Sequence, residues 1–253
     1  MNQDSSIRSY LNQFKTVSLN QIQSANLMDR IDTKFVFSIV KLNALLSSLI
    51  EYYNILQVNQ KNIQEYKSLY FDTINRTFFL DHHNNRVNRF KVRFREYIGS
   101  DLVFLEVKCK NNKRKTLKKR MKVDSIPESM SKDQQDFINK IIGKKISLMS
   151  QQWVNFNRIT LVDKFNTERL TIDLNLNFSN KFNSGSYEDI VIAEIKQDRL
   201  NRSSYFKRIA KDNHILPVRL SKYCMSNLYL NPSLKHNRFK EKLLLINKLK
   251  QLS

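Results

Sequence analysis

Two adjacent segments carry the side chains of this sequence that are best suited to chemistry on an anion. Residues 87–97 read VNRFKVRFREY and residues 102–110 read LVFLEVKCK, with a short turn between them. Side chains along a strand alternate between its two faces, and two strands this close in sequence are typical of a hairpin. One face of this hairpin is apolar. The other face carries Glu106 and six cations: Arg89, Lys91, Arg93, Arg95, Lys108 and Lys110.

A cationic strand face of this kind is suited to binding phosphate. Arg offers a planar fork of donors to phosphate oxygens, and Lys offers a point charge. Phosphoryl transfer requires positioning and charge neutralisation more than covalent catalysis. A strand face in bulk water normally mixes acidic with basic residues, because aligned like charges repel across a sheet. We therefore expect these mutually repelling cations to line a wet cavity to which several strands contribute.

The composition predicts a folded protein that binds an anion. The chain has 253 residues, a formal net charge of +21, and only three Gly and three Pro, which argues against a disordered protein. The excess of positive charge indicates nucleic acid, a phosphate polymer or an anionic membrane as the partner. Cys109 and Cys224 are interpreted as free thiols, residues 1–10 are too polar for a signal peptide, and no apolar stretch could span a membrane. We therefore predict a soluble, cytoplasmic protein.

Hydrophobic periodicity predicts a mixed chain in which strands with one charged face alternate with amphipathic helices. Strands are expected at 28–38, 66–72, 87–97, 102–110, 114–123, 152–161, 169–176 and 190–196. Helices are expected at 7–14, 19–27, 41–53, 74–81, 131–145, 201–212, 221–230 and 238–252. A sandwich would expose the charged faces, whereas a barrel can enclose them. The predicted fold class is α+β: an antiparallel β-barrel tunnel of about eight strands with a basic lumen and helices packed outside.

Seven short motifs, in order, resemble a known family. They are RIDTKF at 30–35, SLYFDT at 68–73, KVRFREY at 91–97, FLEVK at 104–108, NRIT at 157–160, AEIK at 193–196 and SKY at 221–223. Together they resemble the polyphosphate polymerase domain of the vacuolar transporter chaperone (VTC) family, within the CYTH-like triphosphate tunnel metalloenzymes. The resemblance covers about residues 25–230. We expect a single domain over 1–253, with a C-terminal helix at 236–253.

The resemblance implies an enzyme that transfers the γ-phosphoryl group of ATP to a growing inorganic polyphosphate chain, with Mn²⁺ or Mg²⁺ bound. It implies phosphate-holding, catalytic roles for Lys34, Arg93, Arg95, Lys108, Arg158 and Lys222. The further expected substrate-binding residues are Arg30, Lys91, Lys110, Arg169, Lys196 and Ser221. Glu194 is the implied metal ligand, and Glu106 or Asp32 would assist it. Lys118 or Lys119 would match one more basic residue of the tunnel.

Two other functions remain open. A tunnel triphosphatase would hydrolyse triphosphate or a nucleotide, but Arg30 stands where the resembled hydrolases carry an acidic residue, which favours the polymerase. A non-catalytic nucleic-acid-binding protein would interleave aromatic residues with cations on one face. In the hairpin, Phe90 and Phe94 lie on the face opposite the cations, so no specific nucleic acid is expected. The resembled eukaryotic polymerases also carry membrane domains, so export of a product would need a separate membrane partner.

Overall fold

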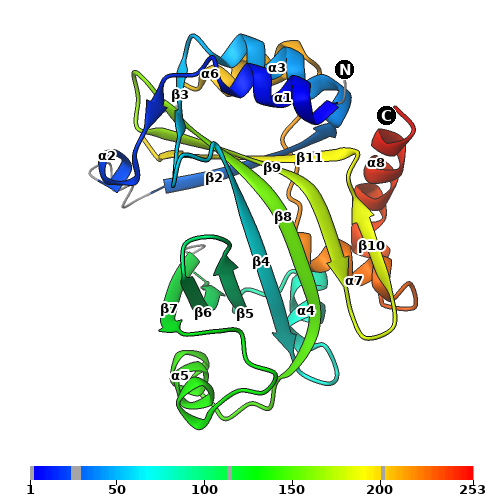
Figure 1. Cartoon of the computed structure of the whole chain (residues 1–253). Coiled ribbons are helices and arrows are strands. Elements are labelled where there is room, and N and C mark those ends of the chain that lie inside the picture. The colour runs from blue at the N-terminus through cyan, green and yellow to red at the C-terminus, as the bar shows by residue number, and fades with distance from the viewer. Residues whose placement is uncertain (1–2, 24–29, 113–115, 201–202, 253) are drawn as a thin grey trace.

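One antiparallel sheet dominates the computed structural model, which describes residues 3–23, 30–112, 116–200 and 203–252 (Figure 1). The strands are β1 (Thr16–Val17), β2 (Arg30–Ser38), β3 (Tyr53–Leu56), β4 (Ile63–Asp72), β5 (Arg89–Tyr97), β6 (Leu102–Lys110), β7 (Thr116–Val123), β8 (Met149–Asp163), β9 (Glu168–Ser179), β10 (Ser184–Tyr187) and β11 (Ile190–Asp198). The helices are α1 (Gln3–Leu11), α2 (Leu19–Gln23), α3 (Leu42–Leu49), α4 (Thr77–His83), α5 (Lys132–Ile142), α6 (Tyr205–Asp212), α7 (Lys222–Leu230) and α8 (Lys240–Lys250).

The sheet is a half-barrel. Its main path runs β2-β11-β9-β8-β4-β5-β6-β7, and every neighbouring pair along it is antiparallel. The sheet bends strongly: β2 and β11 run across the view, the long strands β4 and β8 run downward, and β5, β6 and β7 lie to the left of the lower part of β4 (Figure 1). The predicted α+β class, with an antiparallel curved sheet and helices around it, is confirmed. The path starts at β2 and ends at β7.

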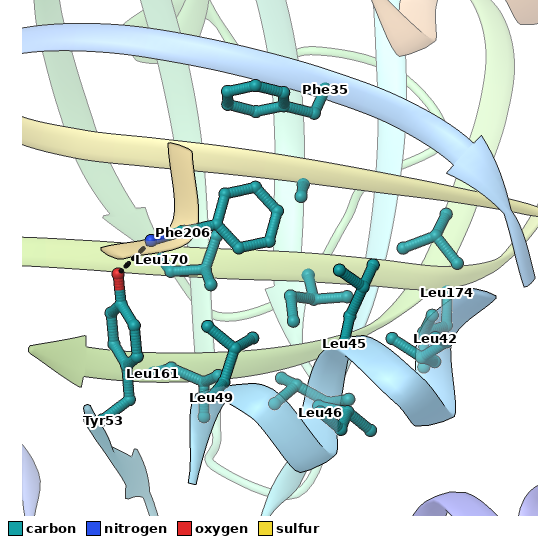
Figure 2. Packing of buried hydrophobic residues seen from close by; sticks show 14 of the residues in the cluster. Phe35, Leu42, Leu45, Leu46, Leu49, Tyr53, Leu161, Leu170, Leu174 and Phe206 are labelled. Atoms are coloured by element: carbon teal, nitrogen blue, oxygen red, sulfur yellow. Dashed lines mark hydrogen bonds between the residues drawn. The ribbon is translucent and has the colours of Figure 1, made fainter. Parts of the chain in front are cut away.

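Helices α1, α3 and α6 cover the convex face above β2, β11, β9 and β8 (Figure 1). The four leucines of α3 recur at helical spacing and are all buried, at Leu42, Leu45, Leu46 and Leu49. They pack on the apolar faces of β8 and β9, as Figure 2 shows for Leu161 and Leu170. Each such leucine contributes about 1.5–3 kcal/mol to stability through burial. The alternation of these strands therefore directs their polar residues to the concave side.

The β5–β6 hairpin is anchored in the same way by α5. Val92, Phe94, Leu105 and Val107 are fully buried in one cluster with Ile138 of α5. Helix α5 begins at a capping box, in which the Ser131 side chain accepts from the backbone of Gln134, and it ends at Gly143 with φ +81°. The apolar face predicted for this hairpin is thus the face that meets the helix. Its cations project to the opposite, concave side.

Helix α7 packs on the concave side of the sheet. It shares a cluster with Val154 and Phe156 of β8 and with Ile192 of β11, which alternate in phase with Arg158 and Glu194. Tyr223, Cys224, Met225 and Leu228 are the buried side chains of α7 that fill this space. The N-terminus of α7 therefore lies on the same side of the sheet as the cations.

The boundaries of several elements differ from those expected. The helix expected over 41–53 ends at Leu49, and Tyr53 starts strand β3, because residues 53–55 pair with residues 161–163 of β8. Strands β1, β3 and β10 were not expected, since such short pairings carry no periodicity of their own. Parts of the elements expected at 19–27, 28–38, 114–123 and 201–212 lie outside the described residues. Among the described helices, none is long and apolar enough to cross a bilayer.

Candidate active site

Three carboxylates organise the cations on the concave face. The first is Glu106 of β6, which stands opposite Arg93 of β5 in the hairpin register. The Nε and Nη2 atoms of Arg93 donate to Glu106 Oε2 at 2.8 and 2.6 Å, and Lys118 of β7 forms an ion pair with Oε1. Lys119 follows Lys118 and alternates to the other face of the strand, so Lys118 is the one of the two that belongs to the site.

The second carboxylate, Asp173 of β9, was not among the expected site residues. Arg158 of β8 stands directly opposite it and donates to both of its oxygens, from Nε at 2.6 Å and from Nη2 at 2.8 Å. Lys222, the first residue of α7, forms an ion pair with the same Asp173 Oδ2. The sequence did contain a signal for Asp173, because strand alternation over 169–176 places it on the same face as Arg169 and Thr171.

The third carboxylate is Glu194 of β11, the expected metal ligand. Its Oε1 atom lies 2.6 Å from Lys34 Nζ, on the neighbouring strand β2, and its Oε2 atom lies 3.4 Å from Lys196 Nζ. Burial alone would raise the pKa of Glu194, but the charges of Lys196, Lys34 and Arg158 outweigh burial and hold the pKa well below its usual range. Glu194 is therefore ionised.

These pairs compensate part of the repulsion among the cations of this face. Each carboxylate pairs with two basic side chains and so neutralises one of their two charges, and the pKa values of Glu106 and Asp173 are also held low by those neighbours against the effect of burial. The face consequently folds as a set of ion pairs in which cations outnumber carboxylates two to one. An incoming polyanion can take over these cations, because phosphate oxygens accept the same fork geometry as a carboxylate.

Three further expected cations have no carboxylate partner among the described residues: Arg95, Lys91 and Lys108. Arg95 donates from Nε to Ser68 Oγ at 3.1 Å, and Lys91 donates to Ser221 Oγ at 3.0 Å. Burial and then the charge of Arg93 lower the pKa of Arg95 to about 10, and the same two causes lower the pKa of Lys108. A bound anion would therefore supply these three side chains with the negative charge that no carboxylate of the described residues provides.

Two aromatic rings lie beneath the cations. Tyr66 of β4 and Phe156 of β8 are stacked, with centroids 5.1 Å apart and 2° between their planes. The guanidinium carbons of Arg95 and Arg158 lie 5.0–5.3 Å from both ring centroids, and Lys222 Nζ lies 4.7 Å from that of Phe156. Cation–π contacts of this kind restrain the guanidinium groups without neutralising them. The hairpin sequence alone did not reveal this platform, because the rings come from other strands.

The SKY motif at 221–223 fixes the start of α7 against three parts of the fold. Ser221 is the N-cap, accepting from Cys224 N at 3.3 Å as well as from Lys91. Tyr223 donates from its hydroxyl to Asp72 Oδ2 at 2.6 Å, at the end of β4. Lys222, between them, is thereby directed at Asp173.

The remaining expected residues lie towards the ends of the face. Arg30 is half-exposed and forms an ion pair with Asp32 at 3.3 Å, while Arg169 donates to the backbone oxygen of Ile22 in α2 at 3.4 Å. A cavity of about 720 Å³ opens beside the face, and its lining includes Lys34, Lys91, Ser221, Arg30 and Lys110. The structure thus brings every expected cation to one side of the sheet.

A divalent metal fits this face only with the help of the substrate. Within the described parts of the chain, no group of three or more His, Cys, Asp and Glu side chains is placed to hold a metal. Mg²⁺ and Mn²⁺ accept one or two carboxylates together with phosphate oxygens. Glu194, whose side chain is 17% exposed, suits this role better than Glu106, whose side chain is 0% exposed.

The curved antiparallel sheet is a fold that this chain shares with solved proteins of low sequence identity. A putative adenylyl cyclase from Hippeastrum, described as having a dominant triphosphatase activity, superposes with a TM-score of 0.53 at 14% identity, covering 80% of this chain and 97% of that one. A putative adenylate cyclase from Bacillus halodurans gives a TM-score of 0.48 at 15% identity, covering 76% and 94%. A protein from Pyrococcus horikoshii OT3 gives 0.43 at 11%, covering 77% and 97%.

The family follows from the sequence match. Residues 29–231 match the VTC domain, so the chain belongs to the VTC domain family, and the resemblance carried by the seven motifs is confirmed. No protein of curated function shows significant similarity to the sequence.

Proposed function

We propose that this protein is an ATP-dependent polyphosphate polymerase, which transfers the γ-phosphoryl group of ATP to the end of a growing inorganic polyphosphate chain. The observation that carries the proposal is the convergence of cations from β2, β5, β6, β7, β8, β11 and α7 on one concave face. Membership of the VTC domain family supports it. Phosphoryl transfer to a phosphate acceptor needs no covalent nucleophile from the protein.

The cations would act by binding and orienting two polyanions. Arg95 and Arg158 on the aromatic platform, with Lys108 and Lys222, are the proposed ligands of the transferring phosphoryl group and its neighbours. A terminal phosphate oxygen of the chain would attack the γ-phosphorus as the bond to the β-phosphate oxygen breaks, and ADP would leave. Preorganised cations stabilise the charge spread over the transferring group. Glu106 is proposed to fix the orientation of the Arg93 fork.

Glu194 is the proposed protein ligand of Mn²⁺ or Mg²⁺, with phosphate oxygens completing the coordination. A metal so bound would supply charge neutralisation at the triphosphate. Lys34 and Lys196, released from Glu194, would then be free to contact phosphate. The expectation that Glu106 also binds the metal stays a prediction. Both oxygens of this carboxylate are paired with cations, Arg93 and Lys118, which would have to be displaced first.

Product analysis tests the proposal directly. Purified protein is incubated with ATP and Mn²⁺, and the products are separated on a gel stained for polyphosphate and assayed for orthophosphate. A ladder of polyphosphate with equimolar ADP supports the polymerase. Orthophosphate with no polymer would contradict it and favour the tunnel triphosphatase, the activity described for the Hippeastrum protein of similar fold.

A competition experiment separates both enzymes from a non-catalytic nucleic-acid-binding protein. At about 0.15 M salt the Debye length is roughly 8 Å, so loose surface binding is screened. Polyphosphate is expected to displace a non-hydrolysable ATP analogue, whereas an oligonucleotide is expected to displace it poorly. Equal displacement by both polymers would contradict a site that selects a bare phosphate chain over nucleic acid. The cytoplasmic location and the separate membrane partner for export stay predictions.

A further inference from the structure

A second group of cations lies in the 720 Å³ cavity, outside the ion pairs described above. The group consists of Arg89 at the start of β5, Arg219 in the segment before α7, and Lys242 in α8, and we call it the mouth cluster. Three separate elements therefore bring one cation each to the same cavity. None of the three belongs to the motifs that carry the family resemblance.

The only carboxylate charge that acts on the mouth cluster among the described residues is that of Glu241, the neighbour of Lys242 along the chain. Arg89, Arg219 and Lys242 form no ion pair there, and Asp32, the one carboxylate in the described lining, is paired with Arg30. The charges of the cluster act on one another: burial first, and Arg219 in addition, lower the pKa values of both Arg89 and Lys242. Cations gathered in a cavity whose one described carboxylate is already paired with another cation indicate a site for an anion.

A buried donor without a partner supports the same interpretation. Arg89 donates from Nη1 to the backbone oxygen of Arg86 at 2.7 Å and to Asn85 Oδ1 at 3.3 Å, which fixes the guanidinium in place. Its Nε atom is buried and makes no hydrogen bond. A buried donor without a partner is destabilising, so its retention beside two further cations points to a ligand that accepts from it.

Charge also explains the state of the neighbouring His82, which lines the same cavity. Burial and the charges of Lys91, Arg89 and Lys110 lower the pKa of His82 to about 2. His82 is therefore neutral at physiological pH and adds no charge of its own. After burial, the positive potential of the surrounding cations is the second cause of its lowered pKa.

We propose that the mouth cluster binds phosphate groups of a polyphosphate chain at a position separate from the reaction site. The identity of the polymer rests on the proposed function, whereas the anion site rests on the geometry. Arg89 and Arg95 are six residues apart on β5, roughly 20 Å at 3.3 Å per residue. A triphosphate held by Arg95 and Arg158 is too short to reach Arg89. A long chain spans both positions, so the mouth cluster would hold long chains selectively.

The test compares two ligands by calorimetric titration in buffer with a chelator: inorganic triphosphate and long-chain polyphosphate. The variant is the double substitution Arg219→Ala with Lys242→Ala. The matched control is Lys211→Ala with Lys248→Ala, which removes the same charge from exposed positions of α6 and α8 that do not line the cavity. Both variants are checked for an unchanged melting temperature.

The double variant is expected to lose about 10-fold or more in affinity for the long chain, as for charge-assisted hydrogen bonds, and less than about twofold for triphosphate. The slope of log K against log salt for the long chain should fall by about 1.4, for two lost phosphate contacts. Arg89→Lys, which keeps the charge and removes the buried Nε donor, should reduce affinity for the long chain by a smaller factor.

Several outcomes would overturn the inference. If the double variant lost as much affinity for triphosphate as for the long chain, the mouth cluster would be part of the triphosphate site. If the control variant lost as much affinity for the long chain, the effect would come from overall charge. A single-stranded oligonucleotide that matched polyphosphate in affinity, and lost the same factor in the double variant, would make the cluster a general polyanion patch. Wild-type protein that bound no polyphosphate would refute the proposed function itself, whereas wild-type binding of both ligands, with no selective loss of long-chain affinity in the double variant, would refute only the mouth cluster.

Discussion

Replacement of Asp173 by Asn removes the charge that faces Arg158 and Lys222 while keeping the shape of the side chain. Asp173 is 3% exposed and the two cations are 16% and 15% exposed, so water can replace little of the lost interaction. Removing one partner of a buried ion pair costs about 3–5 kcal/mol. For a chain of this length, a loss of that size lowers Tm by roughly 6–20 °C. We therefore expect Asp173→Asn to be folded but markedly less stable in buffer without phosphate.

Triphosphate should restore much of that stability. In the wild-type protein a triphosphate at 100 times its Kd stabilises the fold by about 2.7 kcal/mol. In the variant it also supplies the negative charge that Arg158 and Lys222 have lost, so its affinity should rise at least severalfold and its stabilising effect should be larger. Opposite charges placed within contact distance of a partly buried cation account for this gain.

Thermal unfolding and calorimetric titration, each with and without triphosphate in a chelator, measure both effects. Asp136→Asn, at an exposed position of α5, is the matched control and should change neither. A loss below about 1 kcal/mol in Asp173→Asn would show that the carboxylate does not hold the two cations. Triphosphate that stabilised the variant no more than the wild type would show that phosphate does not take the place of Asp173.

Three further outcomes follow from the same ion pairs. Arg95→Ala should lower turnover by about 10²-fold with little change in Tm. Arg93→Ala should lower turnover and also destabilise the protein, because it leaves Glu106 buried with one cation fewer. Equal melting temperatures of the two variants would contradict this difference. Glu194→Gln should weaken Mn²⁺ binding in the presence of a non-hydrolysable ATP analogue, and unchanged metal affinity by calorimetry would remove Glu194 from the metal site. Burial lowers the pKa of Lys196 to about 8, against the opposing charge of Glu194, so triphosphate affinity should fall as pH rises from 7 to 9 and Lys196 loses its proton. Lys196→Arg keeps its charge over this range, and a fall that persisted in it would assign the titration elsewhere.

The sequence by itself determined which faces of the strands are charged. Alternation is a local property of the strand, so the apolar run of Val92 and Phe94 and the polar run of Arg93 and Arg95 could be assigned without any knowledge of the fold. The same reasoning placed Glu194 and Lys196 on one face of β11. The seven motifs then gave the family, and with it the curved antiparallel sheet, since their order along the chain is specific even though each motif is short.

The tertiary structure alone decided how these charges are compensated. Asp173 meets Arg158 from 15 residues away and Lys222 from 49 residues away, on two strands and a helix. Local periodicity carries no information about such pairs, because they depend on strand register and on the place where α7 docks. The same holds for Tyr66 and Phe156, whose stacking under Arg95 requires β4 to lie between β5 and β8. A polar alternation can thus be read residue by residue, but the balance of charge on the face is fixed only when the strands pair.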